Sequence, residues 1–273
     1  MNPFNLKIRH DKIIEIDFIK IRDRLSDFDY KNDYLNINAV NLDLTENVFR
    51  IFNWDYFIDD LKNKKLTLTR PNSWRDPFEN FLLNSKGQLE DGCFVGLENI
   101  RDSFYGLCWS LKADCDGIWR NYKGDNNCAI KAKTTTGKLL DGIYDINNTS
   151  HYISYFIGKV DYVSDDVIAD FFKEKLDFRN YQSGIEFALT LMLKRLAYAY
   201  EEEVRIIVYN KDNVNSLLQI DIDPNHLYDE LILDPWIKPN EFEQKKDELI
   251  NAGFTGKITR SSLYDKPFFI VKL

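Results

Sequence analysis

The sequence predicts an α+β protein rather than a doubly wound α/β fold. Segments with strand-like composition outnumber helical ones, and they mostly do not alternate with helices. No internal repeat and no Pro/Gly/Ser-rich linker divides the chain. At 273 residues, 44% hydrophobic and 14% aromatic, the chain is long enough to bury a sizeable core.

The predicted organisation is a single domain over residues 46–273, preceded by an N-terminal extension or arm over residues 1–45. The arm contains "KIIEIDFIKI", whose weak alternation of apolar and polar residues is typical of a strand. Three roles stay open for it: a regulatory arm, a partner-binding strand or a part of the core sheet.

Periodicity and breaker residues predict the elements in the first half of the domain. Apolar residues at helical spacing in "NVFRIFNWDYFIDDLKNKK" predict a helix, whose closing lysines suit a helix C-terminus. "LTLTRP" predicts a short strand stopped by Pro71. Two buried strands follow, "FYGLCWSL" and "NCAIKAKT", with "DGIWRNY" between them as a helix start or a turn.

The second half of the domain is predicted in the same way. "YFIGKVDYV" predicts a strand, and "GIEFALTLMLKRLAYAYEEE" is the most helical segment, with apolar residues on nearly every face. "VRIIVYN" predicts a central strand and "ELILDPWI" another. "NEFEQKKDELINAGF" predicts an amphipathic helix ending at Gly253, and "GKITRSSL" and "FFIVKL" are expected to close the sheet.

Composition argues against several functional classes. A net charge of −8 argues against a protein that coats nucleic acid over its whole surface, although a local basic groove stays open. The four cysteines form no C-x-x-C pair and only three histidines occur, so no metal is expected. Phosphate-loop and zinc-protease motifs do not occur. Without a signal-peptide pattern or a run of about 18 apolar residues, a cytoplasmic protein with no membrane partner is expected.

Two stretches contain candidate ligand-binding residues. In "LTLTRPNSWRDPFEN", Arg70 ends a strand and Arg75 lies in a polar–aromatic turn, where a guanidinium can hold a phosphate or a carboxylate. A simple pair of Arg75 with Asp76 is the alternative. In "GLCWSLKADCDGIWRNY", Ser110 ends an apolar strand and is followed by further aromatic residues. A hydroxyl beside aromatic rings suits a flat ligand with a polar arm, unless those rings are core.

The third stretch, "YAYEEEVR", contains three consecutive glutamates before a β-branched run. Residues two apart on a strand share a face, so Glu201 and Glu203 are expected to project together from the rim of the sheet. One carboxylate can then stabilise positive charge at an anomeric carbon while the other orients or deprotonates the nucleophile. A fraying helix end is the alternative, but glutamates there oppose the helix dipole.

These stretches, in this order, resemble a bacterial family known mainly as a domain of unknown function. Its N-D-P-F-E/D, C-F-S, M-W-x-H-Y and E-x-E-x-R motifs are matched by "WRDPFEN", "CWSL", "GIWRNY" and "YAYEEEVR". A late I-I-L-G-P and a serine-containing strand are matched by "ELILDPWIKP" and "ITRSSL". The resemblance spans roughly residues 50–265, with Arg75 where Asn is usual.

That family in turn is similar to the R–S–E members of the ADP-ribosyltransferase superfamily. The resemblance implies a split mixed/antiparallel β-sheet core with flanking helices. It implies an NAD-dependent mono-ADP-ribosyltransferase that uses NAD as substrate and no metal. Glu203 would be the catalytic glutamate, and Glu201 the residue that orients the acceptor.

The same resemblance implies how NAD would be bound. Arg70 or Arg75 would contact the NAD phosphates or ribose, and Ser110 would help to position the nicotinamide ribose. Trp119 and Tyr122 would stack on the nicotinamide. The usual S-T-S is only "WSL" in this chain.

The chain also looks like toxin components of bacterial anti-phage systems. That likeness implies a toxin or phage-defence effector that modifies RNA, DNA or protein, with an antitoxin protein as a second partner. For RNA, a local groove of basic residues such as Lys123, Lys131 and Lys133 would be needed.

Two rivals stay open. The first is a non-catalytic binding or sensor module of the same fold, which would be favoured if the two glutamates form salt bridges with Arg205, Lys194 or Arg195 away from any cleft. The second is a glycosidase-like hydrolase, which is weakened because carboxyls two residues apart on one strand face lie too close to flank a sugar.

Overall fold

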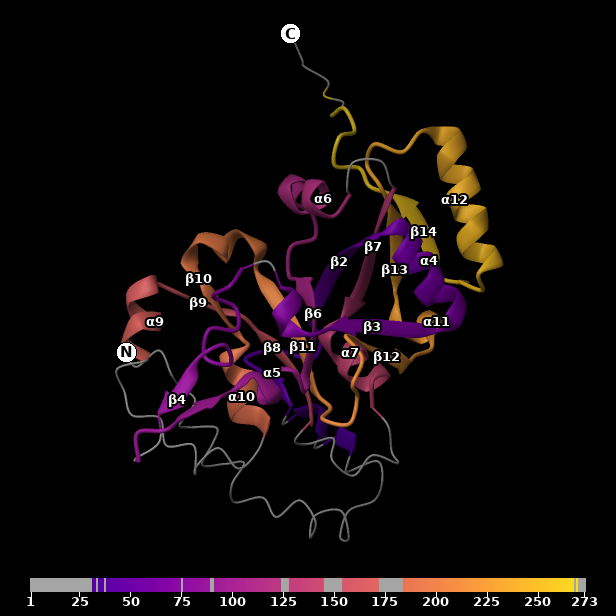
Figure 1. Cartoon of the computed structure of the whole chain (residues 1–273). Helices are drawn as coiled ribbons and strands as arrows, with labels where there is room; N and C mark the ends of the chain where they lie inside the picture. Colours follow the sequence, from indigo (N-terminus) through magenta and orange to yellow (C-terminus); the bar gives the residue numbers. More distant parts are fainter. Residues whose placement is uncertain are drawn as a thin grey trace.

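The structure is a computed structural model that describes residues 31–32, 34–36, 38–74, 76–88, 91–123, 128–144, 154–171, 184–267 and 269. Within these residues, ten strands form one mixed sheet flanked by helices (Figure 1). Most neighbouring strands are antiparallel, whereas β1 with β8 and β13 with β14 are parallel. The predicted α+β class with a mixed sheet and flanking helices is confirmed.

The sheet has a continuous path of eight strands and a two-stranded branch. In order along the path they are β1 (Ala39–Val40), β8 (Tyr155–Lys159), β11 (Glu203–Tyr209), β6 (Phe104–Ser110), β2 (Asn47–Asn53), β7 (Ala129–Thr135), β13 (Glu230–Leu233) and β14 (Lys257–Arg260). The branch leaves β6 and consists of β3 (Lys65–Thr69) and β12 (Leu217–Asp221). Two small sheets pair β9 (Asp161–Val163) with β10 (Leu193–Arg195) and β4 (Lys86–Gln88) with β5 (Phe94–Gly96).

The sheet splits along one edge of β6. On the other edge β11 follows β6 over its whole length, from Glu203 opposite Ser110 to Tyr209 opposite Phe104. On the split edge, β2 pairs with β6 at Ser110 and β3 pairs with it at Gly106. Among the described residues, 107–109 therefore have no strand partner on that edge, and the sheet opens there.

The helices lie between and around these strands. They are α4 (Trp54–Asn63), α5 (Glu98–Arg101), α6 (Asp116–Lys123), α7 (Thr136–Gly142), α9 (Asp165–Phe171), α10 (Gly184–Thr190), α11 (Pro224–Leu227) and α12 (Pro239–Asn251), with 3-10 turns η1 (Pro71–Ser73) and η3 (Leu196–Glu201). Within the described ranges, none is long and apolar enough to cross a membrane.

Both faces of the central strands are buried, but only one is apolar throughout. Leu107 and Val204 belong to the main core, in which α4 also packs. On the opposite face, Phe104 and Ile207 pack into a second apolar cluster. Further along that face the residues become polar, and Arg205 is fully buried there. This change from apolar to polar along one face places charged groups beside the split.

The predicted helix over "NVFRIFNWDYFIDDLKNKK" is wrong in its first seven residues. Asn47–Asn53 form β2, and the helix α4 begins at Trp54. The Asn53 side chain accepts a hydrogen bond from the Asp55 N–H at 3.0 Å, which caps the helix there. The apolar residues before it fit strand alternation as well as helical spacing, and pairing with β6 and β7 decides for the strand.

The long helix predicted over "GIEFALTLMLKRLAYAYEEE" is also wrong. The helix α10 ends at Thr190, Leu193–Arg195 form β10 parallel to β9, and η3 follows. Most residues from Phe187 to Lys194 are buried, whereas Leu196 and Tyr200 are exposed. An apolar run does not by itself distinguish a helix from a strand.

The other predicted strands and helices are found close to their expected positions, except that "YFIGKVDYV" is divided between β8 and β9. The stretches "KIIEIDFIKI" and, apart from Phe269, "FFIVKL" lie outside the described residues. Ala39 and Val40, at the end of the predicted arm, form β1 beside β8.

Candidate active site

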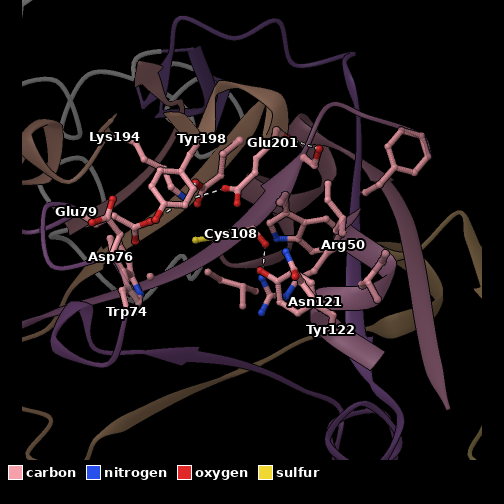
Figure 2. A pocket seen from close by; sticks show the side chains of 18 of the residues that line it. Arg50, Trp74, Asp76, Glu79, Cys108, Asn121, Tyr122, Lys194, Tyr198 and Glu201 are labelled. Carbon is pink, nitrogen blue, oxygen red and sulfur yellow. Dashed lines mark hydrogen bonds and ion pairs between the residues drawn. The ribbon is translucent and has the colours of Figure 1, made fainter. Parts of the chain in front are cut away.

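A cavity of about 370 Å³ lies at the split in the sheet (Figure 2). Its walls come from β2, β6, α6 and the segment that runs from β10 through η3 to the start of β11. Five residues after or at the end of β3 complete them: Thr69, Ser73, Trp74, Asp76 and Glu79. Figure 2 shows Trp74, Glu79 and Lys194 on one side of the cavity and Arg50 and Tyr122 on the other. The size suits a small organic ligand.

Gly106 allows the segment after β3 to cross β6 closely. A Cβ atom added at Gly106 would lie 2.4 Å from the Trp74 side chain, so a larger residue would displace the indole. The same indole lies against the Arg205 guanidinium, 4.6 Å from the ring centroid. Gly106 thus lets Trp74 form part of the cavity wall next to the buried charges.

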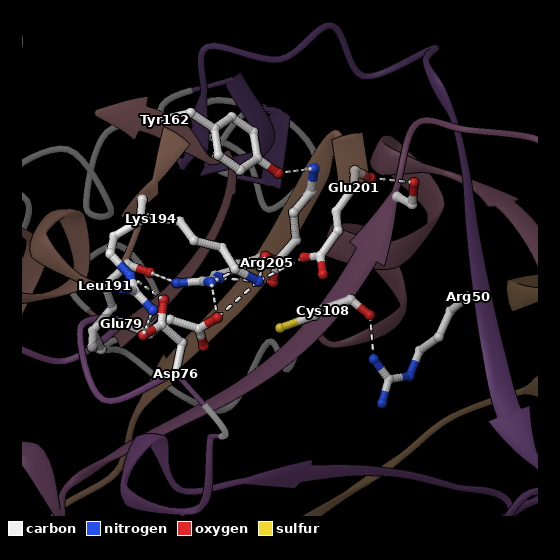
Figure 3. A network of polar contacts seen from close by, with 12 residues as sticks. Arg50, Asp76, Glu79, Cys108, Tyr162, Leu191, Lys194, Glu201 and Arg205 are labelled. Atoms are coloured by element: carbon white, nitrogen blue, oxygen red, sulfur yellow. Dashed lines mark hydrogen bonds and ion pairs between the residues drawn. The ribbon is translucent and has the colours of Figure 1, made fainter. Parts of the chain in front are cut away.

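A buried ion-pair network lines the cavity (Figure 3). Arg205 Nε donates to Glu203 Oε1 at 2.8 Å, and Arg205 Nη2 donates to Glu203 Oε2 at 3.0 Å. Lys194 Nζ lies 3.0 Å from Glu203 Oε2, 2.6 Å from Glu201 Oε2 and 2.8 Å from Glu79 Oε1. Three carboxylates against two cations leave this network with one net negative charge when all are ionised.

The network fixes the ionisation of its members. Burial alone would raise the pKa of Glu203, but the Arg205 guanidinium and the Lys194 ammonium outweigh it and lower the pKa to about 2. Burial would lower the pKa of Lys194, but Glu203 and Glu79 raise it well above its usual value. Burial raises the pKa of the Cys108 thiol, so that thiol is neutral. Glu203 is therefore a carboxylate across the physiological pH range.

Glu201 and Glu203 converge through a turn and not through strand alternation alone. Glu201 ends η3, Glu202 adopts a left-handed conformation with φ 44°, and Glu203 begins β11. The Ser110 hydroxyl donates to the Glu201 carbonyl at 2.6 Å and accepts from the Lys112 N–H at 3.0 Å. Ser110 therefore holds the turn that carries both glutamates.

Among the cavity residues, Arg50 was not predicted from the sequence. It lies on β2, and its Nη1 donates to the Cys108 carbonyl on the split edge of β6 (Figure 3). Its Nε is buried and has no hydrogen-bond partner among the residues that the structure describes, and its guanidinium lies 5.9 Å from the Tyr122 ring centroid. The incorrect prediction of a helix over residues 47–53 explains why Arg50 was overlooked. In a predicted strand, Arg50 would have shared a face with the apolar residues Val48 and Phe52, and a charge on such a face would have indicated a site.

Of the two predicted arginines, Arg70 lies outside the cavity. Arg70 donates to the Tyr105 hydroxyl at 3.1 Å and to the Asn213 carbonyl at 3.0 Å, and it does not line the cavity. Arg75 lies outside the described residues.

The two predicted aromatic residues are separated. Trp119 is fully buried against Ile51 and Ala129, and its Nε1 donates to Asp114 at 3.2 Å. Tyr122, one turn further along α6, is 43% exposed and lines the cavity.

The cavity also contains acids that the sequence assigned no role. Asp76 pairs with Arg195 through two hydrogen bonds of 2.9 and 3.2 Å, and Glu79 pairs with Lys194. Both acids belong to "RDPFE", and both bases to "LKRL", so two ion pairs join these segments. Because each acid and its base lie more than 100 residues apart in the sequence, no local pattern could have predicted that they pair.

One of the three lysines expected to form a basic groove for RNA is not available for that role. Lys131 is buried and donates to the Ala113 carbonyl and to Asp114 at 2.5 and 2.7 Å, so it is not free to contact phosphate. Lys133 is half-buried, and the Lys123 side chain lies outside the described set. In that set, no cluster of three or more His, Cys, Asp or Glu side chains is arranged to hold a metal ion.

No protein-family model and no curated protein matches the chain. Solved structures similar to the chain include DarT from Thermus sp. 2.9 in complex with NAD+, with TM-score 0.39, 11% identity and coverage of 81% of this chain and 98% of that one. The complexes of the same protein with ADP-ribosylated ssDNA and with carba-NAD+ give TM-scores of 0.38 and 0.36 at 12% identity. Their coverage is 79% and 80% of this chain and 94% and 96% of those chains. Similarity this weak carries no argument about function, which is therefore inferred from the cavity residues.

Proposed function

We propose that the protein is an NAD-dependent mono-ADP-ribosyltransferase that modifies a macromolecule. One observation carries the proposal: Glu201 and Glu203, held by Ser110, line the same cavity as Arg50 at the split of the sheet. A carboxylate pair, a guanidinium and an aromatic ring around one cavity suit a dinucleotide with a cationic ring and a pyrophosphate.

In the proposed reaction, the bond between the nicotinamide nitrogen and the ribose anomeric carbon breaks. Nicotinamide leaves with the bonding electron pair and becomes neutral, and positive charge develops on the ribose. The ionised Glu203 carboxylate stabilises that charge. The net negative charge of the network favours the same transition state, although Arg205 and Lys194 offset part of the effect of Glu203.

The remaining roles follow from exposure. The Glu201 side chain is 23% exposed, against 4% for Glu203, so Glu201 is the carboxylate that an acceptor reaches. Glu201 would orient or deprotonate the attacking nucleophile. Arg50 would hold the pyrophosphate, and Tyr122 would stack on the nicotinamide.

The acceptor is proposed to be RNA, DNA or protein, and the biological role that of a cytoplasmic toxin or phage-defence effector with an antitoxin partner. Two exposed aromatic side chains of the cavity, Tyr122 and Tyr200, offer surfaces against which a base or an aromatic side chain could pack. They do not distinguish between these acceptors.

A non-catalytic binding module is the second candidate. The ion pairs of both glutamates with Lys194 favour it, because paired carboxylates are less available to a ligand. Against it, both glutamates line the cavity and do not lie away from it.

The test is transfer of label from NAD to cellular RNA, DNA or protein by the wild type, Glu203→Gln and Glu202→Gln. Glu202 is the matched control because it lies between the two glutamates and its side chain is 49% exposed. Glu203→Gln is expected to slow transfer by about 10²–10³-fold, and Glu202→Gln to leave it unchanged. Absence of labelling by the wild type with every acceptor, or equal labelling by wild type and Glu203→Gln, would refute the enzyme assignment.

A further inference from the structure

Lys194 contacts three carboxylates that line the cavity. Its Nζ lies 2.6–3.0 Å from one oxygen each of Glu79, Glu201 and Glu203. An ammonium group has three N–H donors, so each carboxylate can take one. The Lys194 side chain is 7% exposed and therefore has little access to water as an alternative partner.

The three carboxylates come from three separate segments. Glu79 follows η1, Glu201 ends η3 and Glu203 begins β11. Arg205 reaches Glu203 and Glu79, at 2.8 and 3.4 Å, whereas Lys194 also reaches Glu201. Without the ammonium, three acids would meet beside one guanidinium, and mutual repulsion would separate them or protonate one of them.

We infer that Lys194 is a positioning residue that holds the Glu201 and Glu203 carboxylates together at the cavity wall. The inference deepens the proposed transferase function, on which its catalytic consequence rests. The charge of Lys194 favours the ionised form of Glu203, and its tetrahedral donors set where both carboxylates point. Arginine keeps the charge, but its planar fork does not direct three hydrogen bonds to three separate segments.

The ionisable groups around this cluster are known for each neighbouring element. They are Glu79 from the segment after η1, Cys108 from β6, Tyr122 from α6, Tyr162 from β9, Tyr198, Tyr200 and Glu201 from η3, and Arg205 from β11. Burial raises the pKa values of both Cys108 and Tyr162, so these two groups stay neutral below pH 9. The acids and the two cations alone therefore determine the titration.

The first experiment measures the glutamate carboxyls directly. The full chain is labelled with carboxyl-¹³C glutamate, and the Glu201 and Glu203 resonances are assigned with the Glu201→Gln and Glu203→Gln variants. In Lys194→Met, the Glu203 resonance is expected to titrate about 1–3 pH units higher than in the wild type. In Lys194→Arg the titration is expected to stay near that of the wild type.

Lys112→Met is the matched control, because Lys112 lies 3.5 Å from the exposed Glu202 in the same acidic run. It is expected to leave the Glu201 and Glu203 titrations unchanged. Unchanged titrations in Lys194→Met would overturn the inference. Because this readout needs no turnover, it decides the inference even if the wild type transfers nothing and the proposed function fails.

The second experiment measures NAD turnover against pH. Lys194→Met is expected to lose kcat progressively as the pH falls, with little change in KM for NAD, because protonated acids bind substrate but do not stabilise the transition state. Lys194→Arg is expected to lower kcat at every pH without moving the profile. If Lys194→Met fails to fold, Lys194→Arg still decides, since a kcat equal to that of the wild type would contradict positioning by three directed hydrogen bonds.

Discussion

Ser110 lies directly opposite Glu203 where β6 pairs with β11. The Ser110 hydroxyl donates a hydrogen bond to the Glu201 carbonyl, so Ser110 connects the β6–β11 pair to the turn that precedes β11. Ser110 therefore lies beside the cavity and also has a structural role.

Replacing Ser110 with alanine should destabilise the protein, because it leaves the Glu201 carbonyl and the Lys112 N–H without this partner. The expected loss is about 1–3 kcal/mol in the free energy of unfolding, measured with urea. Transfer activity should fall as well, since the turn that carries Glu201 is released. Full activity in a folded Ser110→Ala protein would contradict this role.

Arg50 and Arg70 can be separated by affinity for NAD. Arg50→Met should weaken NAD binding about 10–100-fold, because it removes charged donors from the cavity. Arg70→Met is the matched control, since its guanidinium is held by Tyr105 and Asn213 outside the cavity. Calorimetric titration of both variants measures the difference. A larger effect of Arg70→Met would instead support Arg70 as the arginine that binds NAD, as the sequence resemblance implies.

Truncation of Trp119 should lower stability, whereas truncation of Tyr122 should lower the affinity for NAD. Trp119→Ala removes a fully buried side chain and should cost about 3–5 kcal/mol of unfolding free energy. Tyr122→Ala should leave stability nearly unchanged and weaken NAD binding about 3–10-fold, because its exposed ring lines the cavity. Urea unfolding and calorimetry test both. Tight binding by Tyr122→Ala would rule out the stacking role.

The buried guanidinium of Arg205 should contribute strongly to the stability of the fold. Arg205→Met leaves Glu203 and Glu79 with Lys194 as their remaining cation and should cost about 3–5 kcal/mol. Arg120→Met is the surface control: its i,i+4 pair with Asp116 is exposed, so urea unfolding should show no clear change. Similar unfolding curves for the two variants would show that the buried network does not stabilise the fold.

Acid should abolish the contribution of Glu203 to stability. Its folded-state pKa of about 2 lies below the ordinary value of 4.5, so its ionised form stabilises the folded state. That contribution is complete above pH 4.5 and is lost as the pH falls towards 2. Burial raises the pKa of Glu79 despite Arg205 and Lys194. Glu79 therefore makes the opposite contribution to the pH dependence of stability, and it does so in the wild type and in Glu203→Gln alike.

The measurement compares the wild type with Glu203→Gln by urea unfolding between pH 2.5 and 7. The gap in unfolding free energy should be widest near neutral pH and should close as the pH falls. Glu202→Gln should follow the wild type throughout. A gap that stays constant with pH would show that the charge of Glu203 does not contribute.

Sequence reasoning found most strands because their apolar runs are bounded by clear breakers, as Pro71 bounds β3. It failed at Asn47–Asn53 and after Thr190, where apolar residues fit two periodicities and strand pairing decides. It identified Glu201 and Glu203 because they lie two residues apart in one local pattern. It missed Arg50, whose contact with the Cys108 carbonyl joins two separate strands. It named Lys194 among the possible salt-bridge partners of the glutamates, and the structure contains both pairs.

The opening beside β6 has a consequence for association between molecules. An unpaired strand edge at the margin of a sheet can recruit a strand from another chain and start aggregation. Here the free edge at residues 107–109 is flanked by β2 and β3, and Arg50 covers the Cys108 carbonyl. The stretch therefore lies inside the sheet and not at its outer margin, and it is not the kind of long exposed edge that recruits strands from other molecules.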